Sequence, residues 1–126
     1  MMGHGISIRF AIHGFTVYLY GRSNDSLLKA QSKINRTLEL LNDLDVVNIN
    51  QNAGIIGNIE LTTNLKDSIS DSDLIIESIN EDLRDKQILY TEISDLLKPT
   101  SILTSNTSSL MPKLLFAKIP NKSNVA

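Results

Sequence analysis

The alternation of strand-like and helix-like segments is the feature that most restricts how this chain can fold. Residues 74–79 form a largely apolar run of strand length, of the kind that is buried on both faces of a parallel sheet. Strands are also expected at residues 16–20, 59–63 and 101–104, where β-branched and apolar residues cluster or alternate with polar ones. Because helical patterns separate these strands, the sequence predicts an α/β fold with a doubly wound parallel sheet.

Helical patterns occupy the intervals between the expected strands. Gly14 is a suitable stop for a short helix at the start of the chain. Residues 23–25 offer capping side chains for a helix of about five turns, along which leucine and isoleucine recur at helical spacing. Pro99 ends a further helix. The expected helices cover residues 3–13, 27–44 and 81–97, and residues 45–58 are expected to be a loop with room for a short helix.

Composition excludes several classes of protein. Of the 126 residues, 41% are hydrophobic and 21% are charged, which is near the globular average and predicts a folded domain. The net charge of -2 and the lack of a basic patch argue against a nucleic-acid partner. Without cysteine the chain has no disulfide, no cysteine-ligated zinc and no cysteine nucleophile, and we predict no metal site. No signal-peptide pattern or apolar run of about 18 residues is present, which predicts a soluble, cytoplasmic protein that does not bind membranes.

Polar and small residues follow three of the expected strands. In open parallel sheets, ligands bind at the carboxyl ends of the strands. Those ends correspond here to Gly21-Arg22, to residues 78–81 and to residues 105–109. The sequence therefore places its polar and small residues where a cofactor would bind.

A partial glycine motif opens the chain. Dinucleotide-binding domains have a strand, then Gly-x-Gly-x-x-Gly, then a helix whose N-terminus holds the pyrophosphate. Gly3 and Gly5 could be the end of such a motif, but the chain starts at Met1, so the strand and the first glycines are lacking. Taken alone, the two glycines are weak evidence for such a motif, and a helix start built from small residues is the favoured interpretation.

Five segments, in the expected order, resemble motifs of the NAD-binding domain of the 3-hydroxyacyl-CoA dehydrogenases. Residues 2–6, Met-Gly-His-Gly-Ile, resemble the second half of the family's Gly-x-Gly-x-Met-Gly-x-Gly-Ile-Ala, and residues 14–19 match the strand that follows. Residues 59–65 are similar to its Thr-Thr-Asp-Leu segment, and residues 73–81 to its Asp-Leu-Val-Ile-Glu-Ala-Val-x-Glu. Residues 105–110 contain its Asn-Thr-Ser-Ser turn. The resemblance spans nearly the whole chain and implies a Rossmann-like domain whose first strand is missing.

The resemblance also implies roles for single residues. It places Gly3 beside the pyrophosphate of the cofactor, and Ser78 and Glu81 along its nicotinamide half. Lys86 matches a lysine that reaches the cofactor. In the last motif, Asn106 shapes the turn and Ser108 supplies a hydroxyl near the substrate carbonyl, as an assisting catalytic residue.

Each of these roles has a structural alternative. Glu81 and Asp82 could simply complement the dipole at a helix N-terminus. Lys86 could lie on a solvated helix face. Residues 106–109 could be a capped turn that enters a helix.

The chain departs from the family at the end of the expected second strand. The family has an aspartate there, which binds the adenosine ribose of NAD, whereas this chain has Gly21 followed by Arg22 and Ser23. An arginine in place of a carboxylate suits a 2′-phosphate. We therefore expect NAD as the cofactor from the family, and NADP as a possible preference from Gly21 and Arg22. The alternative is a surface arginine beside a glycine with no role in binding.

A second departure concerns the general base. In the family the next residues are Gly-x-His-Phe-Phe-Asn-Pro, whose histidine takes the hydroxyl proton as the hydride leaves for the nicotinamide. The chain ends at Ala126, before this motif, and neither His4 nor His13 fits the role. We therefore expect residues 1–126 to be a partial dinucleotide-binding domain that lacks the C-terminal helical domain, which completes the acyl-CoA site and the homodimer interface.

Three interpretations of function follow. The first is the NAD(P)-binding part of an oxidoreductase that transfers a hydride between 3-hydroxyacyl-CoA and a nicotinamide cofactor in fatty-acid or hydroxybutyryl-CoA metabolism. In this interpretation the chain is inactive alone and is completed by a separate piece. The second is a catalytically inactive remnant or an interaction module. The third is a dehydrogenase for other β-hydroxyacids or sugar acids. Because the missing strand would leave backbone groups and apolar surface exposed, we expect a marginally stable chain.

Overall fold

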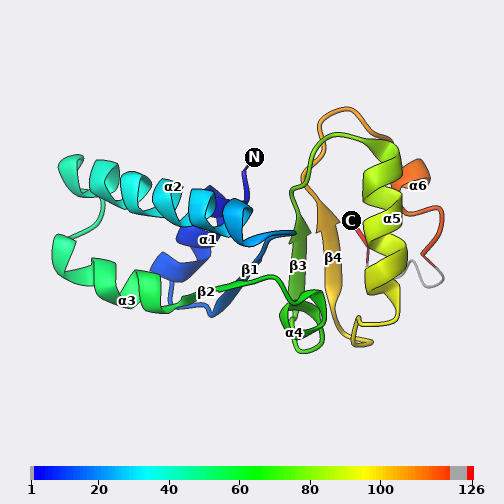
Figure 1. Ribbon diagram of the computed structural model, residues 1–126, viewed down its shortest axis with the longest axis horizontal. Helices are drawn as coiled ribbons and strands as arrows, with labels where there is room; N and C mark the ends of the chain where they lie inside the picture. The colour runs from blue at the N-terminus through cyan, green and yellow to red at the C-terminus, as the bar shows by residue number, and fades with distance from the viewer. Residues whose placement is uncertain (1, 120–124) are drawn as a thin grey trace. The chain divides into compact units, whose positions relative to one another are not determined.

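The computed structural model describes residues 2–119 and 125–126, and it divides the chain into two compact units. The N-terminal unit is Met2–Asn64 and the C-terminal unit is Leu65–Ala126. Each unit contains one pair of parallel strands, covered by helices that precede and follow them in the chain (Figure 1). The α/β class with parallel strands is therefore confirmed. Within the described residues the strands form two two-stranded sheets.

The N-terminal unit pairs its two strands in parallel. Strand β1 runs beside β2 in a register that sets Val17 opposite Ile59 and Tyr20 opposite Thr62. The core of this unit is formed where α1, α2 and α3 pack together, and Leu19 and Ile59 of the strands pack against it. The elements are α1 (Gly3–Ile12), β1 (Val17–Tyr20), α2 (Asn24–Asp43), the 3-10 helix η1 (Ile49–Gln51), α3 (Asn52–Gly57) and β2 (Ile59–Thr62).

Gly14 ends α1, as the sequence predicted. Its φ of 82° lies in the left-handed region, which glycine adopts without steric cost. The Gly14 N–H donates to the Ala11 carbonyl and the Phe15 N–H donates to the Phe10 carbonyl, which is the pattern of a Schellman motif. The rings of Phe10 and Phe15 meet edge to face at 5.7 Å and supply the apolar contact of that motif.

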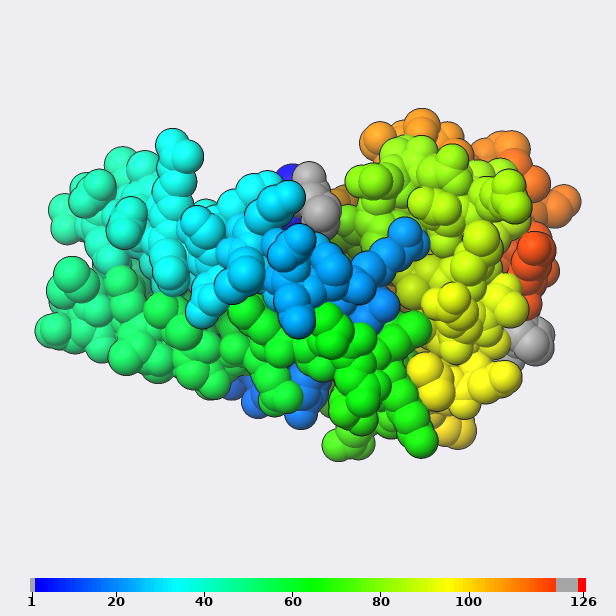
Figure 2. All heavy atoms as spheres, viewed as in Figure 1, coloured from blue at the N-terminus to red at the C-terminus, as the bar shows by residue number. Residues whose placement is uncertain are grey.

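Helix α2 starts at the predicted cap. The Ser23 hydroxyl accepts from the Ser26 N–H, and the Ser26 hydroxyl in turn accepts from the Ser23 N–H. Ile34 and Leu38 lie on the buried face of the helix. In Figure 2 much of the outer surface of α2, coloured cyan, faces the viewer. Leu28 and Leu40 of α2 are exposed.

The expected loop at residues 45–58 is more helical than predicted. Asn48 caps η1 through its side chain, and α3 follows directly. The side chains of Asn42 and Asn52 hydrogen-bond to each other and hold α3 against the end of α2. Asparagine favours loops by forming such local bonds, so its abundance concealed these two short helices from pattern analysis.

The C-terminal unit repeats the parallel pairing. Strand β3 runs beside β4, with Leu74 opposite Ile102 and Glu77 opposite Ser105. At the chain end, Val125 forms a parallel bridge with Leu103, and residues 120–124 lie outside the described part. The elements are α4 (Leu65–Ile69), β3 (Leu74–Glu77), α5 (Leu83–Ser94), β4 (Ile102–Ser105) and α6 (Pro112–Leu115). Helices α4 and α6 were not predicted.

Helices α5 and α6 cover one side of the β3–β4 pair (Figure 1). Leu103 of β4, Ile93 of α5 and Leu115 of α6 are almost completely buried in this core. The most buried stripe of α5 also contains Lys86 and Tyr90, two turns and one turn before Ile93, respectively. A lysine on a fully buried helix face requires a compensating charge. None of the described helices is long and apolar enough to cross a membrane.

Candidate functional site

A polar cluster lies where β3 and β4 end. The strand register sets Glu77 opposite Ser105, and the Ser105 hydroxyl donates to Glu77 Oε2 over 2.6 Å. From α5, the Tyr90 hydroxyl donates to the same oxygen over 2.6 Å. Lys86 Nζ lies 3.2 Å from that oxygen and 3.4 Å from Ser105 Oγ. Three side chains from β4 and α5 therefore converge on one buried carboxylate of β3.

The Glu77 carboxylate is buried and surrounded by hydrogen-bond donors. Its side chain is 1% exposed, and its second oxygen accepts the Ile79 backbone N–H over 2.6 Å. Each partner of Glu77 is a donor, so the carboxylate is fully satisfied without water. A buried carboxylate is tolerated in proteins when it is paired and hydrogen-bonded in this way.

Lys86 joins this buried carboxylate to a more exposed one. Its side chain has no exposed surface, and Nζ lies 2.8 Å from Glu81 Oε2 as well as close to Glu77. Burial alone would lower the pKa of Lys86, but the hydrogen bonds and charges of Glu81 and Glu77 outweigh burial and raise it. Burial raises the pKa of Tyr90, and its hydrogen bond to Glu77 adds to that increase. Both groups are therefore protonated at neutral pH.

Glu81 connects this cluster to the turn that follows β4. Its Oε1 accepts from the Thr107 hydroxyl, from the Ser108 N–H over 3.1 Å, and from the N–H and hydroxyl of Ser109 over 3.2 and 3.1 Å. The hydrogen bond with Lys86, then that with Thr107, then those with the Ser109 and Ser108 N–H groups lower the pKa of Glu81 from 4.5 to about 2. The carboxylate is 34% exposed, so it remains open to solvent on one side.

Acid is expected to release the turn from Glu81. Because the pKa of Glu81 is lowered from 4.5 to about 2, the ionised carboxylate holds the turn above pH 4.5, and this contribution is lost as the pH falls from 4.5 to about 2. Carboxyl 13C shifts of Glu81 and the amide shifts of Ser108 and Ser109 should titrate together in that window. In a Glu81→Gln control the amide shifts of Ser108 and Ser109 should not change over this pH range. An inflection near pH 4.5 would contradict the prediction.

The structure brings together three of the residues singled out from the sequence. Glu81, Lys86 and the Ser108 backbone share one network. Glu81 lies before the Asp82 N-cap of α5 and bonds across to the turn, so the helix-dipole alternative for Glu81 does not describe its contacts. The alternative for Lys86, a solvated helix face, is wrong because the side chain is buried. The turn at residues 106–109 precedes α6, which starts at Pro112.

Two further predicted residues flank the network. Ser78 follows β3, and within the described part of the chain its buried hydroxyl oxygen has no hydrogen-bond partner. Asn106 is exposed, and its N–H donates to the Glu77 carbonyl over 2.7 Å. The Ser108 residue is likewise exposed.

The remaining predicted residues lie in the N-terminal unit. Gly3 is the first residue of α1, and a Cβ there would meet Leu19 at an ordinary 3.5 Å. Gly21 follows β1, and its N–H donates to the Thr62 carbonyl over 3.0 Å. Arg22 is exposed. The structure does not test the cofactor contacts predicted for these three residues.

A side chain at Gly21 is expected to destabilise the fold. Its Cβ would lie 2.6 Å from Ser26 Oγ and 2.7 Å from Leu27 Cδ2, so both the α2 cap and a buried leucine would have to shift. We expect Gly21→Ala to lower the free energy of unfolding in urea by about 1–3 kcal/mol. The matched control is Gly5→Ala in α1, where a Cβ meets no atom within 4 Å. This control should be neutral or stabilising, and equal losses in both variants would refute the packing argument.

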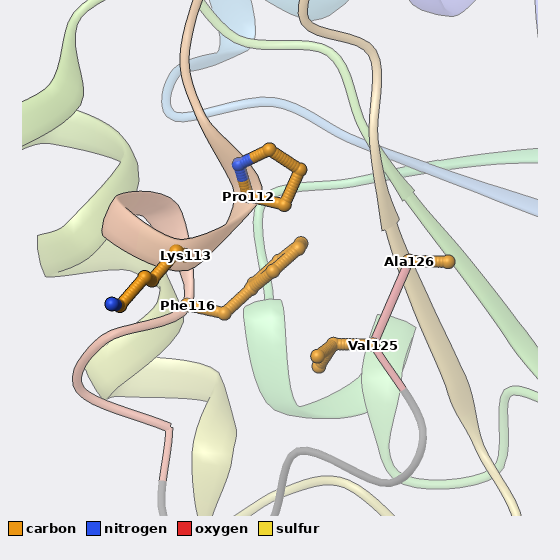
Figure 3. A pocket seen from close by; sticks show the side chains of 5 residues that line it. All are labelled: Pro112, Lys113, Phe116, Val125 and Ala126. Atoms are coloured by element: carbon orange, nitrogen blue, oxygen red, sulfur yellow. The ribbon is translucent and has the colours of Figure 1, made fainter.

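A concave surface of the C-terminal unit has a lining that differs from the charged cluster. A cavity of about 230 Å³ is lined by Pro112, Lys113, Phe116, Val125 and Ala126. Figure 3 shows the Phe116 ring between Pro112 and Val125, with the Lys113 amine directed away. None of these residues belongs to the charged network, so the candidate site rests on the chemistry around Lys86. Among the described residues no cluster of histidine, aspartate and glutamate could hold a metal ion.

Sequence reasoning missed half of the cluster. Glu77 was counted within an apolar strand, and Tyr90 was not singled out on its helix. The spacing of Lys86 and Tyr90, four residues apart on one helix face, was a usable signal. Ser105 and Thr107 contact the network through the strand register and the turn, which no local pattern reveals.

Comparison with known proteins agrees with the sequence motifs. The family model for the 3-hydroxyacyl-CoA dehydrogenase NAD binding domain matches residues 1–126. The chain is 32% identical over 115 residues to a probable 3-hydroxyacyl-CoA dehydrogenase of Caenorhabditis elegans, covering 87% of this chain and 37% of that protein. It is 32% identical over 109 residues to a probable 3-hydroxybutyryl-CoA dehydrogenase of Deinococcus radiodurans, covering 86% and 38%. The chain thus spans less than two fifths of the length of these relatives.

A solved structure shows the same fold. The crystal structure of 3-hydroxybutyryl-CoA dehydrogenase from Escherichia coli matches with a TM-score of 0.90 and 28% identity, over 98% of this chain and 26% of that one. Together with the parallel strand pairs, this likeness identifies the fold as Rossmann-like.

Proposed function

The chain belongs to the family of NAD-binding domains of 3-hydroxyacyl-CoA dehydrogenases, and we propose that it binds a nicotinamide dinucleotide through the Glu81–Lys86 site. The observation that carries this proposal is the ion pair of 2.8 Å between a fully buried ammonium and a carboxylate that is 34% exposed. The pair lies beyond the carboxyl end of β3, where parallel α/β sheets bind their ligands.

The residues present fit a nicotinamide ribose. Ionised Glu81 is an acceptor that can take hydrogen bonds from ribose hydroxyls, and Lys86 is a charged donor beside it. The buried Ser78 hydroxyl, which lacks a partner in the described part of the chain, is a further polar group at this edge. A bound nicotinamide supplies the acceptor for a hydride. Glu81 would then accept hydrogen bonds from the ribose, and Lys86 would supply one fixed positive charge at this site.

We propose Ser108 as the assisting residue toward the substrate. It is exposed beside the Glu81 network, and its N–H is already held by the Glu81 carboxylate over 3.1 Å. Oxidation of a 3-hydroxyacyl-CoA also needs a general base for the hydroxyl proton. We propose that the base, the acyl-CoA site and a homodimer contact come from a separate helical domain.

Cofactor choice is proposed to depend on the end of β1. Gly21 offers no carboxylate to a ribose, and Arg22 beside it is an exposed donor that suits a phosphate. We therefore propose that the chain either accepts NADPH as well as NADH or binds NADPH more tightly than NADH. A charge-assisted contact of about 1.5–3 kcal/mol corresponds to a preference of roughly tenfold to a hundredfold.

Titration of the purified chain with NADH and NADPH, followed by nicotinamide fluorescence, tests the proposal. Saturable binding with a Kd on the order of 10 μM is expected. Arg22→Ala should weaken NADPH binding and leave NADH binding unchanged. Tighter binding of NADH by the unaltered chain would refute the proposed preference. No binding of either cofactor by a folded chain would refute the function and favour an inactive remnant.

A further inference from the structure

Lys86 is paired with two carboxylates of unlike character. Glu77 is 1% exposed, whereas Glu81 is 34% exposed. The Glu77 carboxylate receives donors from β4, from α5 and from the backbone of Ile79, so it has no freedom to turn. Glu81 lies on a loop between β3 and α5, and its contacts are with the Lys86 amine and an exposed turn.

This asymmetry matters when a ligand engages Glu81. A carboxylate oxygen that accepts ribose hydroxyls must give up part of its bonding to Lys86 or to the turn. Lys86 itself cannot follow, because its side chain has no exposed surface and its helix is packed in the core. A buried ammonium without a counter-charge either loses its proton or moves out of its buried position.

We propose that Glu77 is a positioning residue, the permanent counter-ion that keeps Lys86 charged and in place while Glu81 is exchanged to the cofactor. The inference deepens the proposed function and depends on it for the identity of the ligand. The groups that contact the Lys86 amine are Glu77 from β3, Glu81 from the loop and Ser105 from β4, and Tyr90 of α5 shares the Glu77 oxygen with it. Because burial and Glu77 raise the pKa of Tyr90, the phenol stays neutral and cannot replace the carboxylate.

The first experiment needs no cofactor. Glu81→Gln imitates the carboxylate that has left Lys86, and selective 13C labelling of lysine side chains reports the protonation of Lys86. We expect Lys86 in Glu81→Gln to stay protonated over the alkaline range in which a solvated lysine keeps its charge, because Glu77 remains. The Glu77→Gln/Glu81→Gln double variant should lose the proton within that range. Early loss of the proton in Glu81→Gln, whose Glu77 is intact, would overturn the proposal even if no Glu77 variant folds.

The second experiment measures NADH affinity against pH. The unaltered chain should bind equally from neutral to mildly alkaline pH, because the raised pKa of Lys86 keeps the amine charged there. Glu77→Gln should bind progressively more weakly over that range, by about tenfold at its upper end. Glu77→Asp, which restores the charge, should recover the flat profile. A loss that is equal at every pH would indicate a merely structural role and overturn the proposal.

The two experiments separate the two ideas. If the unaltered chain binds no NADH, the proposed function fails, and the lysine titration in Glu81→Gln still decides whether Glu77 alone retains the ammonium. If NADH binds but Lys86 deprotonates in Glu81→Gln, the function stands and the role of Glu77 fails.

Discussion

Replacement of Lys86 by methionine is expected to lower the free energy of unfolding by about 3–5 kcal/mol, because it leaves the Glu77 carboxylate buried without a counter-charge. Methionine nearly matches the length and volume of the lysine stem, so the loss measures the charge and not a cavity. Glu77 would keep its bonds to Tyr90, Ser105 and Ile79, but all three donors are neutral. Urea unfolding followed by circular dichroism gives the difference directly.

Two controls make this result specific. Lys98 lies 2.7 Å from Asp73 Oδ1, but that carboxylate is almost fully exposed, so Lys98→Met should change stability little. Lys86→Met combined with Glu77→Gln removes both charges and should recover part of the lost stability. If Lys86→Met were no more harmful than Lys98→Met, Glu77 would not depend on Lys86 as its counter-charge in the folded protein.

The long elements were predictable because their signals are local. The stop of α1 at Gly14 and the cap of α2 at Ser23 each depend on residues within one helical turn, and both are confirmed. The short helices α3, α4 and α6 have four to six residues, which is too few to display a periodic apolar face. Such helices form only where tertiary contacts hold them, so sequence patterns gave neither their bounds nor, for α4, any sign of a helix.

The residues of the candidate site were likewise predictable only in part from the sequence. The family motifs led to Glu81 and Lys86, and the structure places the two side chains in contact. Glu77 was missed because its burial depends on a register that sets it opposite Ser105, and on a helix that aims Lys86 at the same point. A strand and a helix separated by several residues of loop carry no local pattern that predicts such convergence. The predicted cofactor contacts of Gly3, Gly21 and Arg22 remain predictions.

Truncation of Leu103 to alanine is expected to lower the free energy of unfolding by about 2–5 kcal/mol. The Leu103 side chain has no exposed surface and packs with Ile93 and Leu115. Residue 103 also precedes Ser105 by two positions on β4, and its carbonyl accepts the Ala126 N–H over 2.9 Å. Amide exchange at β4 should therefore quicken together with the loss of stability, since this strand supplies the Ser105 hydroxyl to Glu77.

The neighbouring isoleucine provides the matched control. Ile102 lies on the opposite face of β4 and is 48% exposed, so Ile102→Ala should cost less than about 1 kcal/mol. The two variants remove similar side chains from adjacent positions, and their difference isolates burial from strand propensity. Equal costs would show that the face of β4 bearing Ile102 is covered in solution. In that event the two-stranded sheet of the C-terminal unit would be one part of a larger core, and the stability of the candidate site would depend on whatever completes it.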